Sequence, residues 1–219
     1  MPEINLLDKY PKTKRPIDER GNLITEDHRR IAKEFGRSYF DEDRLYGYGG
    51  YHYHPRFWQD TVRRFRDHYQ LESDAKVLDV GCAKGFMLYD FKKLMPNLKI
   101  SGIDISSYAI DNAKEEVKSY LRVGNATSLP FEDKSFDLVI SINTIHNLER
   151  NDCLKAIKEI QRVSRKNSFI TVDAWRTNEE KERLLKWNLT ALTYMHVKEW
   201  ETFFMEAAYT GDYYWFIAD

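Results

Sequence analysis

The stretch VLDVGCAKGFML, from Val77 to Leu88, decides the fold. An apolar run that contains an acid, then two glycines four residues apart, then a helical pattern is typical of a strand, a tight turn and a helix N-terminus. Gly81 and Gly85 carry no Cβ, so a ligand can lie against their backbone and both can adopt a positive φ. The stretch therefore predicts a nucleotide-type binding loop.

A second apolar run, ISGIDIS from Ile100 to Ser106, carries Asp104 near its end. In nucleotide-binding sites of this kind, an acidic residue about 20 positions after the glycines accepts hydrogen bonds from both hydroxyls of the ribose. Asp104 stands at about that separation from Gly81 and Gly85. We therefore expect a ligand that contains a ribose, with Asp104 and the following Ile105 in its site.

The register of the loop distinguishes two kinds of ligand. A nicotinamide dinucleotide site has the pattern G-x-G-x-x-G, which this chain lacks. Instead Gly81, Ala83 and Gly85 fall at alternate positions, with Asp79 two residues before the first. This register resembles the first motif of the class I S-adenosylmethionine (SAM)-dependent methyltransferases, in which an acid precedes glycines at every second residue. Ala83 departs from the middle glycine by one methyl group.

The resemblance extends over residues 75–173. The segment GNATSLPFEDKSFDLVISINTIHNL, from Gly124 to Leu148, is similar to the part of the ubiquinone/menaquinone-type branch that holds adenine and leads into the fourth strand. The family usually has an acid where Asn125 stands, and the Asn carbonyl can accept the same hydrogen bond from the adenine amino group. Ala126 would offer its backbone N–H to the adenine ring.

This resemblance implies SAM as cofactor, S-adenosylhomocysteine (SAH) as product, and a site beyond the C-terminal ends of the strands. Asp79 is expected to stay ionised while it orders the loop or reaches the methionine amino group. Phe86 could stack near the adenosine or pack at the helix start, and Cys82 is expected to be a small apolar filler rather than a redox-sensitive thiol. The predicted cofactor-binding residues are Asp79, Gly81, Cys82, Ala83, Gly85, Phe86, Asp104, Ile105, Asn125, Ala126 and Asn143.

The sequence NTIHN, from Asn143 to Asn147, follows the fourth strand, where this family positions the transferred methyl group. Enzymes that methylate amino groups of nucleic-acid bases typically carry N/D-P-P-Y/F here, which SINT does not match. His146 is the candidate general base for a hydroxyl acceptor, because an imidazole titrates near neutral pH. The alternative is a structural His that bonds a loop carbonyl, or one that merely orients an amine.

Tyrosine and glycine dominate YGYGGYHYH, from Tyr46 to His54. Glycines provide hinges and tyrosines provide contact area at low entropic cost, so we predict that this segment is a lid over the site. Arg56, just beyond the segment, could pair with the methionine carboxylate of SAM. The alternative is that these aromatic side chains pack a helical cap against the sheet. The predicted lid and substrate residues are Tyr46, Tyr48, Tyr51, His54, Arg56 and Trp58.

Strands and helices alternate after Lys76, which predicts an α/β fold: a Rossmann-like, doubly wound and mostly parallel sheet with helices on both faces and an N-terminal helical lid. We divide the chain into an arm (1–20), a helical and aromatic lid (21–74) and the SAM-binding core (75–219). Helical spacing predicts helices over 26–40 and 107–118. The family ends with two strands, one of them antiparallel; only 212–218 is clear here, and the other is expected near 192–196 or is missing.

The 34 Lys and Arg residues nearly cancel the 35 Asp and Glu residues, which argues against a broad nucleic-acid-binding face. No leader and no apolar run of roughly 20 residues is visible, so a cytoplasmic protein without a membrane partner is expected. Only two cysteines occur, and neither groups with His at metal-ligand spacing, so we expect neither a disulfide framework nor a metal.

Together these features predict methyl transfer from SAM to an oxygen or nitrogen of a small polar metabolite or sugar. Methylation of a protein or RNA is the second alternative, and a non-catalytic SAM-binding module is a third. A nicotinamide oxidoreductase is the least favoured reading. A homodimer is compatible with the apolar segment 184–195.

Overall fold

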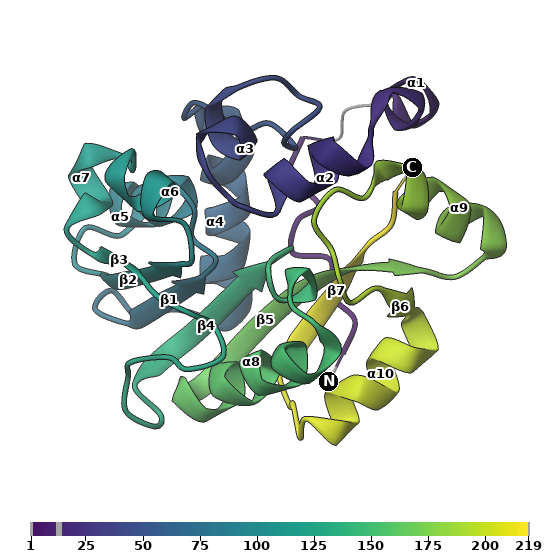
Figure 1. The fold of residues 1–219 in the computed structure, drawn as a ribbon. Coiled ribbons are helices and arrows are strands. Elements are labelled where there is room, and N and C mark those ends of the chain that lie inside the picture. Colours follow the sequence, from purple (N-terminus) through teal and green to yellow (C-terminus); the bar gives the residue numbers. More distant parts are fainter. Residues whose placement is uncertain (1, 12–14, 219) are drawn as a thin grey trace.

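The computed structural model describes residues 2–11 and 15–218. Within them, one seven-stranded sheet has the order β3-β2-β1-β4-β5-β6, and β7 also pairs with β5 (Figure 1). The strands are β1 (Lys76–Val80), β2 (Lys99–Asp104), β3 (Leu121–Val123), β4 (Phe136–Ile142), β5 (Ser164–Trp175), β6 (Met195–His196) and β7 (Asp212–Phe216). The strand order reverses direction between β1 and β4, so the predicted doubly wound α/β fold is confirmed.

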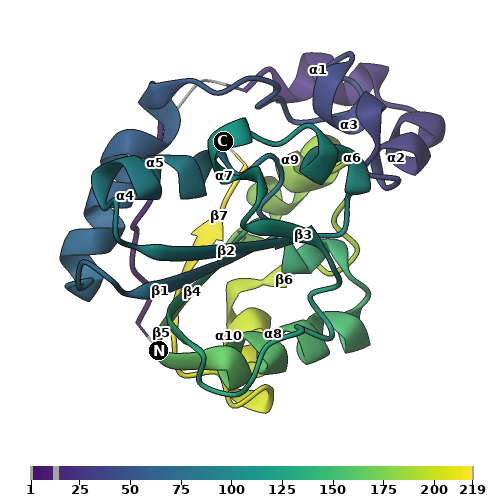
Figure 2. The same ribbon diagram turned by 90° about the vertical axis from the view of Figure 1, so that its left-hand side faces the viewer.

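Two layers of helices cover the sheet (Figure 2). On one face α4 (Pro55–Tyr69) and α5 (Phe86–Leu94) bury Phe65, Leu88 and Phe91, and on the other α8 (Arg150–Val163) and α10 (Val197–Glu206) bury Ile157 and Trp200. The remaining helices are α1 (Ile17–Leu23), α2 (Glu26–Ala32), α3 (Arg37–Asp41), α6 (Ser107–Asp111), α7 (Glu115–Lys118), the 3-10 turn η1 (Ile145–Asn147) and α9 (Asn178–Trp187). Across the described part of the chain, every helix is too short or too polar to cross a membrane.

The segment 21–74, which is predicted to be a lid, divides into two parts in the structure. Helices α1 to α3 and the loop that follows them lie over the C-terminal ends of the strands, whereas α4 belongs to the helical layer of the sheet (Figure 1). Phe65 of α4 is fully buried and packs edge-on against Phe169 of β5, with ring centroids 5.1 Å apart. The cover over the site therefore ends near His54, where α4 begins.

Two helices predicted as continuous are broken. The segment 26–40 divides into α2 and α3 because Phe35 takes a left-handed backbone conformation (φ 48°) and Gly36 then begins the next helix. The side chain of Ser106 donates a hydrogen bond to the Phe35 carbonyl, so this break contacts the end of β2. The segment 107–118 likewise divides into α6 and α7.

The C-terminal strands differ from the prediction in direction. β7 runs parallel to β5, from Phe169 opposite Asp212 to Asp173 opposite Phe216, so the expected antiparallel strand is wrong. The chain leaves β5 at its C-terminal end and returns through α9, β6 and α10, which brings it back to the start of the strands. β6 falls within the expected range 192–196 and pairs with Ala174 and Trp175.

The N-terminal arm docks on the sheet. The Ile4 amide donates to the Tyr213 carbonyl (2.9 Å), and Leu6 is fully buried. The arm therefore occupies hydrogen-bonding positions along β7, which would otherwise offer unpaired strand groups. α1 begins at Ile17, inside the range predicted as arm, and residues 1 and 12–14 of that range lie outside the described residues.

Candidate active site

The loop between β1 and α5 has the backbone conformation that its glycines suggest. Gly81, Ala83 and Gly85 all have a positive φ (87°, 47° and 73°). A Cβ added at Gly81 would lie 2.0 Å from the Thr144 hydroxyl oxygen, so no other residue fits without displacing the β4 tip. Ala83 adopts a conformation that costs an L-residue roughly 1–2 kcal/mol, which explains why its position suits glycine.

Asp104 is the last residue of β2, and its two carboxylate oxygens accept hydrogen bonds from two different turns. One oxygen accepts from the Ala83 amide (2.7 Å) and the other from the Ser106 amide (2.9 Å). A carboxylate has about four lone-pair sites, so each oxygen can accept one further hydrogen bond. This geometry fits the two hydroxyls of a ribose.

Asp79 is buried beside Asp104 at the end of β1. Burial, and then the neighbouring Asp104 carboxylate, raise the pKa of Asp79 to about 8. Asp79 is therefore protonated near neutral pH in the unliganded protein, which differs from the ionised state expected from the sequence. Two adjacent buried acids fit a ligand that brings hydroxyl donors and an ammonium group, and SAM has both.

We predict that SAH binding releases close to one proton near neutral pH, because its ammonium group favours the Asp79 carboxylate. The affinity should rise as the pH approaches 8. Between pH 3.8 and about 8 the folded protein holds a proton on Asp79 that the unfolded chain does not hold. Without ligand, the free energy of unfolding should therefore fall as the pH rises through this range. Calorimetry in buffers of different ionisation enthalpy measures the release; equal release by wild type and Asp79→Asn would contradict the assignment.

The remaining predicted cofactor residues surround this loop. The Asn125 side-chain oxygen accepts from the Thr127 amide and hydroxyl (both 2.9 Å), which fixes a turn after β3. Ile105 is 56% exposed next to Asp104, an apolar surface of the kind an adenine ring would cover. Cys82 is buried beneath the loop, as expected of an apolar filler, and Ala126 packs against the core.

Phe86 and Asn143 lie on opposite sides of the strand tips. Phe86 begins α5 and packs edge-on against Tyr53 of the lid, with ring centroids 5.9 Å apart. Asn143 has a φ of 50°, and its side-chain oxygen accepts from the Thr171 hydroxyl (2.8 Å). The tip of β4 is thereby tied to β5.

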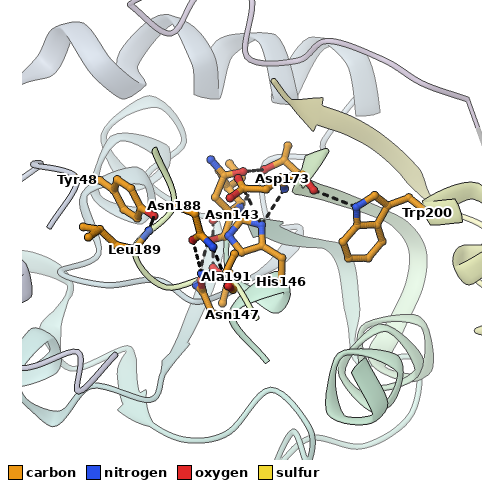
Figure 3. A network of polar contacts seen from close by, with 12 residues as sticks. Tyr48, Asn143, His146, Asn147, Asp173, Asn188, Leu189, Ala191 and Trp200 are labelled. Carbon is orange, nitrogen blue, oxygen red and sulfur yellow. Dashed lines mark hydrogen bonds and ion pairs between the residues drawn. The ribbon is translucent and has the colours of Figure 1, made fainter. Parts of the chain in front are cut away.

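His146 is held in a structural arrangement. Its Nδ1 accepts a hydrogen bond from the Asp173 amide (2.8 Å), so in this tautomer the ring proton is on Nε2 (Figure 3). The ring is only 4% exposed, and burial lowers its pKa. The His146 carbonyl also accepts from the amides of Leu192 and Thr193. The lone pair that a general base needs is thus engaged, and the geometry favours the structural alternative for His146.

Among the predicted lid residues, Tyr48 and Tyr51 accept hydrogen bonds from distant parts of the chain. Tyr48 accepts a hydrogen bond from the Leu189 amide (2.7 Å), and its ring lies 5.6 Å from that of Trp187. The carbonyl of Tyr51 accepts from the ammonium group of Lys84, within the glycine loop (3.1 Å).

The other predicted lid residues are not brought to the site. Tyr46 packs against His28, and His54 caps α4 by accepting from the Arg56 amide (3.2 Å). Arg56 is exposed and lies over the ring of Phe57 rather than near a carboxylate. Trp58 packs against Tyr10 of the arm (5.0 Å between centroids), as the cap alternative proposed.

A buried ion pair joins the lid to the cofactor loop. Lys84, only 6% exposed, pairs with Asp41 at the end of α3, and Asp41 also accepts from the Tyr108 hydroxyl (2.7 Å). Because Lys84 lies between the two loop glycines, a movement of the lid must change contacts of the loop itself.

Two further residues near the strand tips, Tyr39 of α3 and Asp173 of β5, were not predicted from the sequence. Burial raises the pKa of Tyr39, and the charges of Tyr48, Asp104 and Asp173 raise it further. Tyr39 is half-buried, and its ring packs edge-on against those of Phe35, Phe40 and Tyr48. The available signal for Asp173 was a single acid in the otherwise apolar run FITVDAW of β5.

Comparisons with known proteins agree with this geometry. Residues 71–218 match the model of a methyltransferase domain family. The chain is 34% identical over 132 residues to tRNA (carboxymethyluridine(34)-5-O)-methyltransferase of Arabidopsis thaliana, covering 59% of this chain and 31% of that protein. It is 30% identical over 146 residues to demethylmenaquinone methyltransferase of Staphylococcus aureus, covering 64% and 57%.

Among solved structures, the YcgJ protein of Bacillus subtilis has the same fold, with a TM-score of 0.52 and 20% identity over 67% of this chain and 66% of that one. The chain spans between about a third and somewhat more than half of the curated relatives described above. It belongs to the methyltransferase domain family, within class I of the SAM-dependent methyltransferases. SAM is the cofactor of this class, and Asp79, Asp104 and the glycine loop are the groups that fit it.

Proposed function

We propose that this chain transfers the methyl group of SAM to an oxygen or nitrogen of a small polar acceptor enclosed beneath the lid. The observation that carries the proposal is the cover over the strand tips. Asp79 and Asp104 are only 5% and 9% exposed, and the lid is attached to the loop between them through Lys84 and Asp41. A lid of this kind opens to admit ligands and then excludes water from the reacting groups.

The residues of the site have separable tasks. Asp104 would hold the ribose diol, Asp79 the ammonium group, and the backbone of the glycine loop would lie against the ligand. When bound, SAM supplies an electrophilic methyl group on a sulfonium. The chain contributes alignment of the acceptor with that methyl group and exclusion of water, both of which lower the barrier without a strong acid or base.

RNA is the second candidate acceptor, and the Arabidopsis relative, named as a tRNA methyltransferase, favours it. Two observations support the small acceptor instead. The chain has a net charge of −1, and the side chains gathered at the strand tips include the acids Asp79, Asp104 and Asp173. A polynucleotide is held mainly by clustered cations that neutralise its phosphates.

Transfer of label from methyl-labelled SAM tests the proposal. The purified chain is incubated with a cell extract separated into small-molecule, RNA and protein fractions. We expect label in the small-molecule fraction, with formation of SAH in step. Label that appears only in RNA or protein would overturn the proposed acceptor, and SAH formation in none of the fractions would favour a non-catalytic binding module.

A further inference from the structure

Asp173, near the C-terminal end of β5, is a buried acid whose carboxylate accepts no side-chain or backbone hydrogen bond from the described residues. It is 5% exposed, and among the described residues the nearest ionisable contact of its carboxylate is Nδ1 of His146, 3.6 Å away. That nitrogen accepts a hydrogen bond from the Asp173 amide, so it has no proton to donate to the carboxylate. Burial raises the pKa of Asp173, and a ligand that brought a donor or a cation to it would favour the carboxylate form.

The position of Asp173 connects it to the place of methyl transfer. Thr171 and Asp173 point to the same face of β5, because side chains alternate along a strand. Thr171 bonds the side chain of Asn143 at the tip of β4, where the transferred methyl group is expected. Figure 3 shows Asp173, His146 and Asn143 converging at this point.

The cover over the strand tips carries two phenols that interact electrostatically with Asp173. The phenol of Tyr39 interacts in this way with both Asp104 and Asp173. Burial, and then the Asp173 carboxylate, raise the pKa of Tyr48. The groups that face Asp173 are thus two phenols and a neutral imidazole, with Arg15 as a further cation whose charge acts on Asp173. An N–H or O–H group of the methyl acceptor that reached Asp173 would supply a hydrogen-bond donor to its carboxylate.

We propose that Asp173 binds the acceptor group and takes up its proton during methyl transfer, an inference that rests on the proposed function. The bond from the methyl carbon to the acceptor atom forms while the bond from that carbon to sulfur breaks, and its electron pair stays on sulfur. The proton leaves the acceptor for the Asp173 carboxylate. His146 is then a positioning residue, which holds the Asp173 backbone through its amide.

Sinefungin tests this without knowledge of the acceptor, because it carries an amine where SAM carries the sulfonium methyl group. The ammonium group should pair with Asp173, so wild type should bind sinefungin at least tenfold more tightly than SAH. In Asp173→Asn the sinefungin affinity should fall at least tenfold, which is 1.4 kcal/mol, while SAH affinity stays unchanged. The matched control is Asp137→Asn, which alters an equally buried acid at the opposite end of the sheet, where Asp137 accepts from the Lys76 amide.

The outcomes separate the inference from the proposed function. If SAH binds but the sinefungin affinity is the same in wild type and Asp173→Asn, Asp173 does not face the methyl position. If Asp173→Asn does not fold, the ratio of the two affinities in wild type still decides: a sinefungin affinity no better than that of SAH overturns the inference. If SAH does not bind to wild type, the proposed function itself fails.

Discussion

Gly81→Ala is expected to abolish measurable SAH binding and to lower the free energy of unfolding by about 2–5 kcal/mol. A positive φ costs an L-residue roughly 1–2 kcal/mol, and forcing a methyl group into packed surroundings costs about 1–3 kcal/mol more. At Gly81 the added Cβ would lie 2.0 Å from the Thr144 hydroxyl and 2.6 Å from the Thr144 Cβ. The loop would therefore move away from the β4 tip, which would distort the proposed cofactor site.

Gly50→Ala is the matched control for backbone strain. Gly50 has nearly the same φ, 82° against 87°, but a Cβ there would have no neighbour within 4 Å. Backbone strain should therefore lower the free energy of unfolding of Gly50→Ala by only roughly 1–2 kcal/mol, and the variant should still bind SAH. Urea unfolding of both variants measures the difference, and equal destabilisation would show that the Thr144 contact is not what requires glycine at position 81.

Asp104→Asn is expected to weaken SAH binding about a hundredfold or more. Hydrogen bonds to charged groups contribute roughly 1.5–3 kcal/mol each, so two ribose hydroxyls together account for at least about 3 kcal/mol. Both Asp104 oxygens already accept from backbone amides, so the amide group of Asn would place donor against donor at Ala83 or Ser106. That mismatch should also loosen the loop.

Titration calorimetry with SAH measures this loss. The control is Asp111→Asn, which removes an exposed carboxylate seven residues further along the chain and should leave the affinity unchanged. Equal affinities of wild type and Asp104→Asn for SAH would remove the ribose assignment.

The cofactor loop could be predicted from the sequence because its determinants are local. Glycines at alternate positions after an apolar strand imply a backbone of positive φ, and the structure has that backbone at Gly81, Ala83 and Gly85. Asp104 follows from spacing alone, because adjacent parallel strands end at the same edge. The mostly parallel sheet could also be predicted, because the alternation of strands and helices along the chain is visible in the sequence.

Features that depend on distant parts of the chain could not be predicted. The helical spacing over 26–40 suggested one continuous helix, but the left-handed backbone of Phe35 interrupts it between α2 and α3. The direction of β7 depends on the path through α9 and α10, which has no signature within the strand itself. His146 could equally have been a base or a structural group until the position of the Asp173 amide was known.

The proposed function requires that a SAM-type nucleoside binds at the tips of β1 and β2. Calorimetric titration of the wild-type chain with SAH, and with NAD as the comparison ligand, tests this most directly. We predict a saturable heat for SAH with one molecule bound per chain, and none for NAD. No heat with SAH, or saturable binding of NAD instead, would contradict the account.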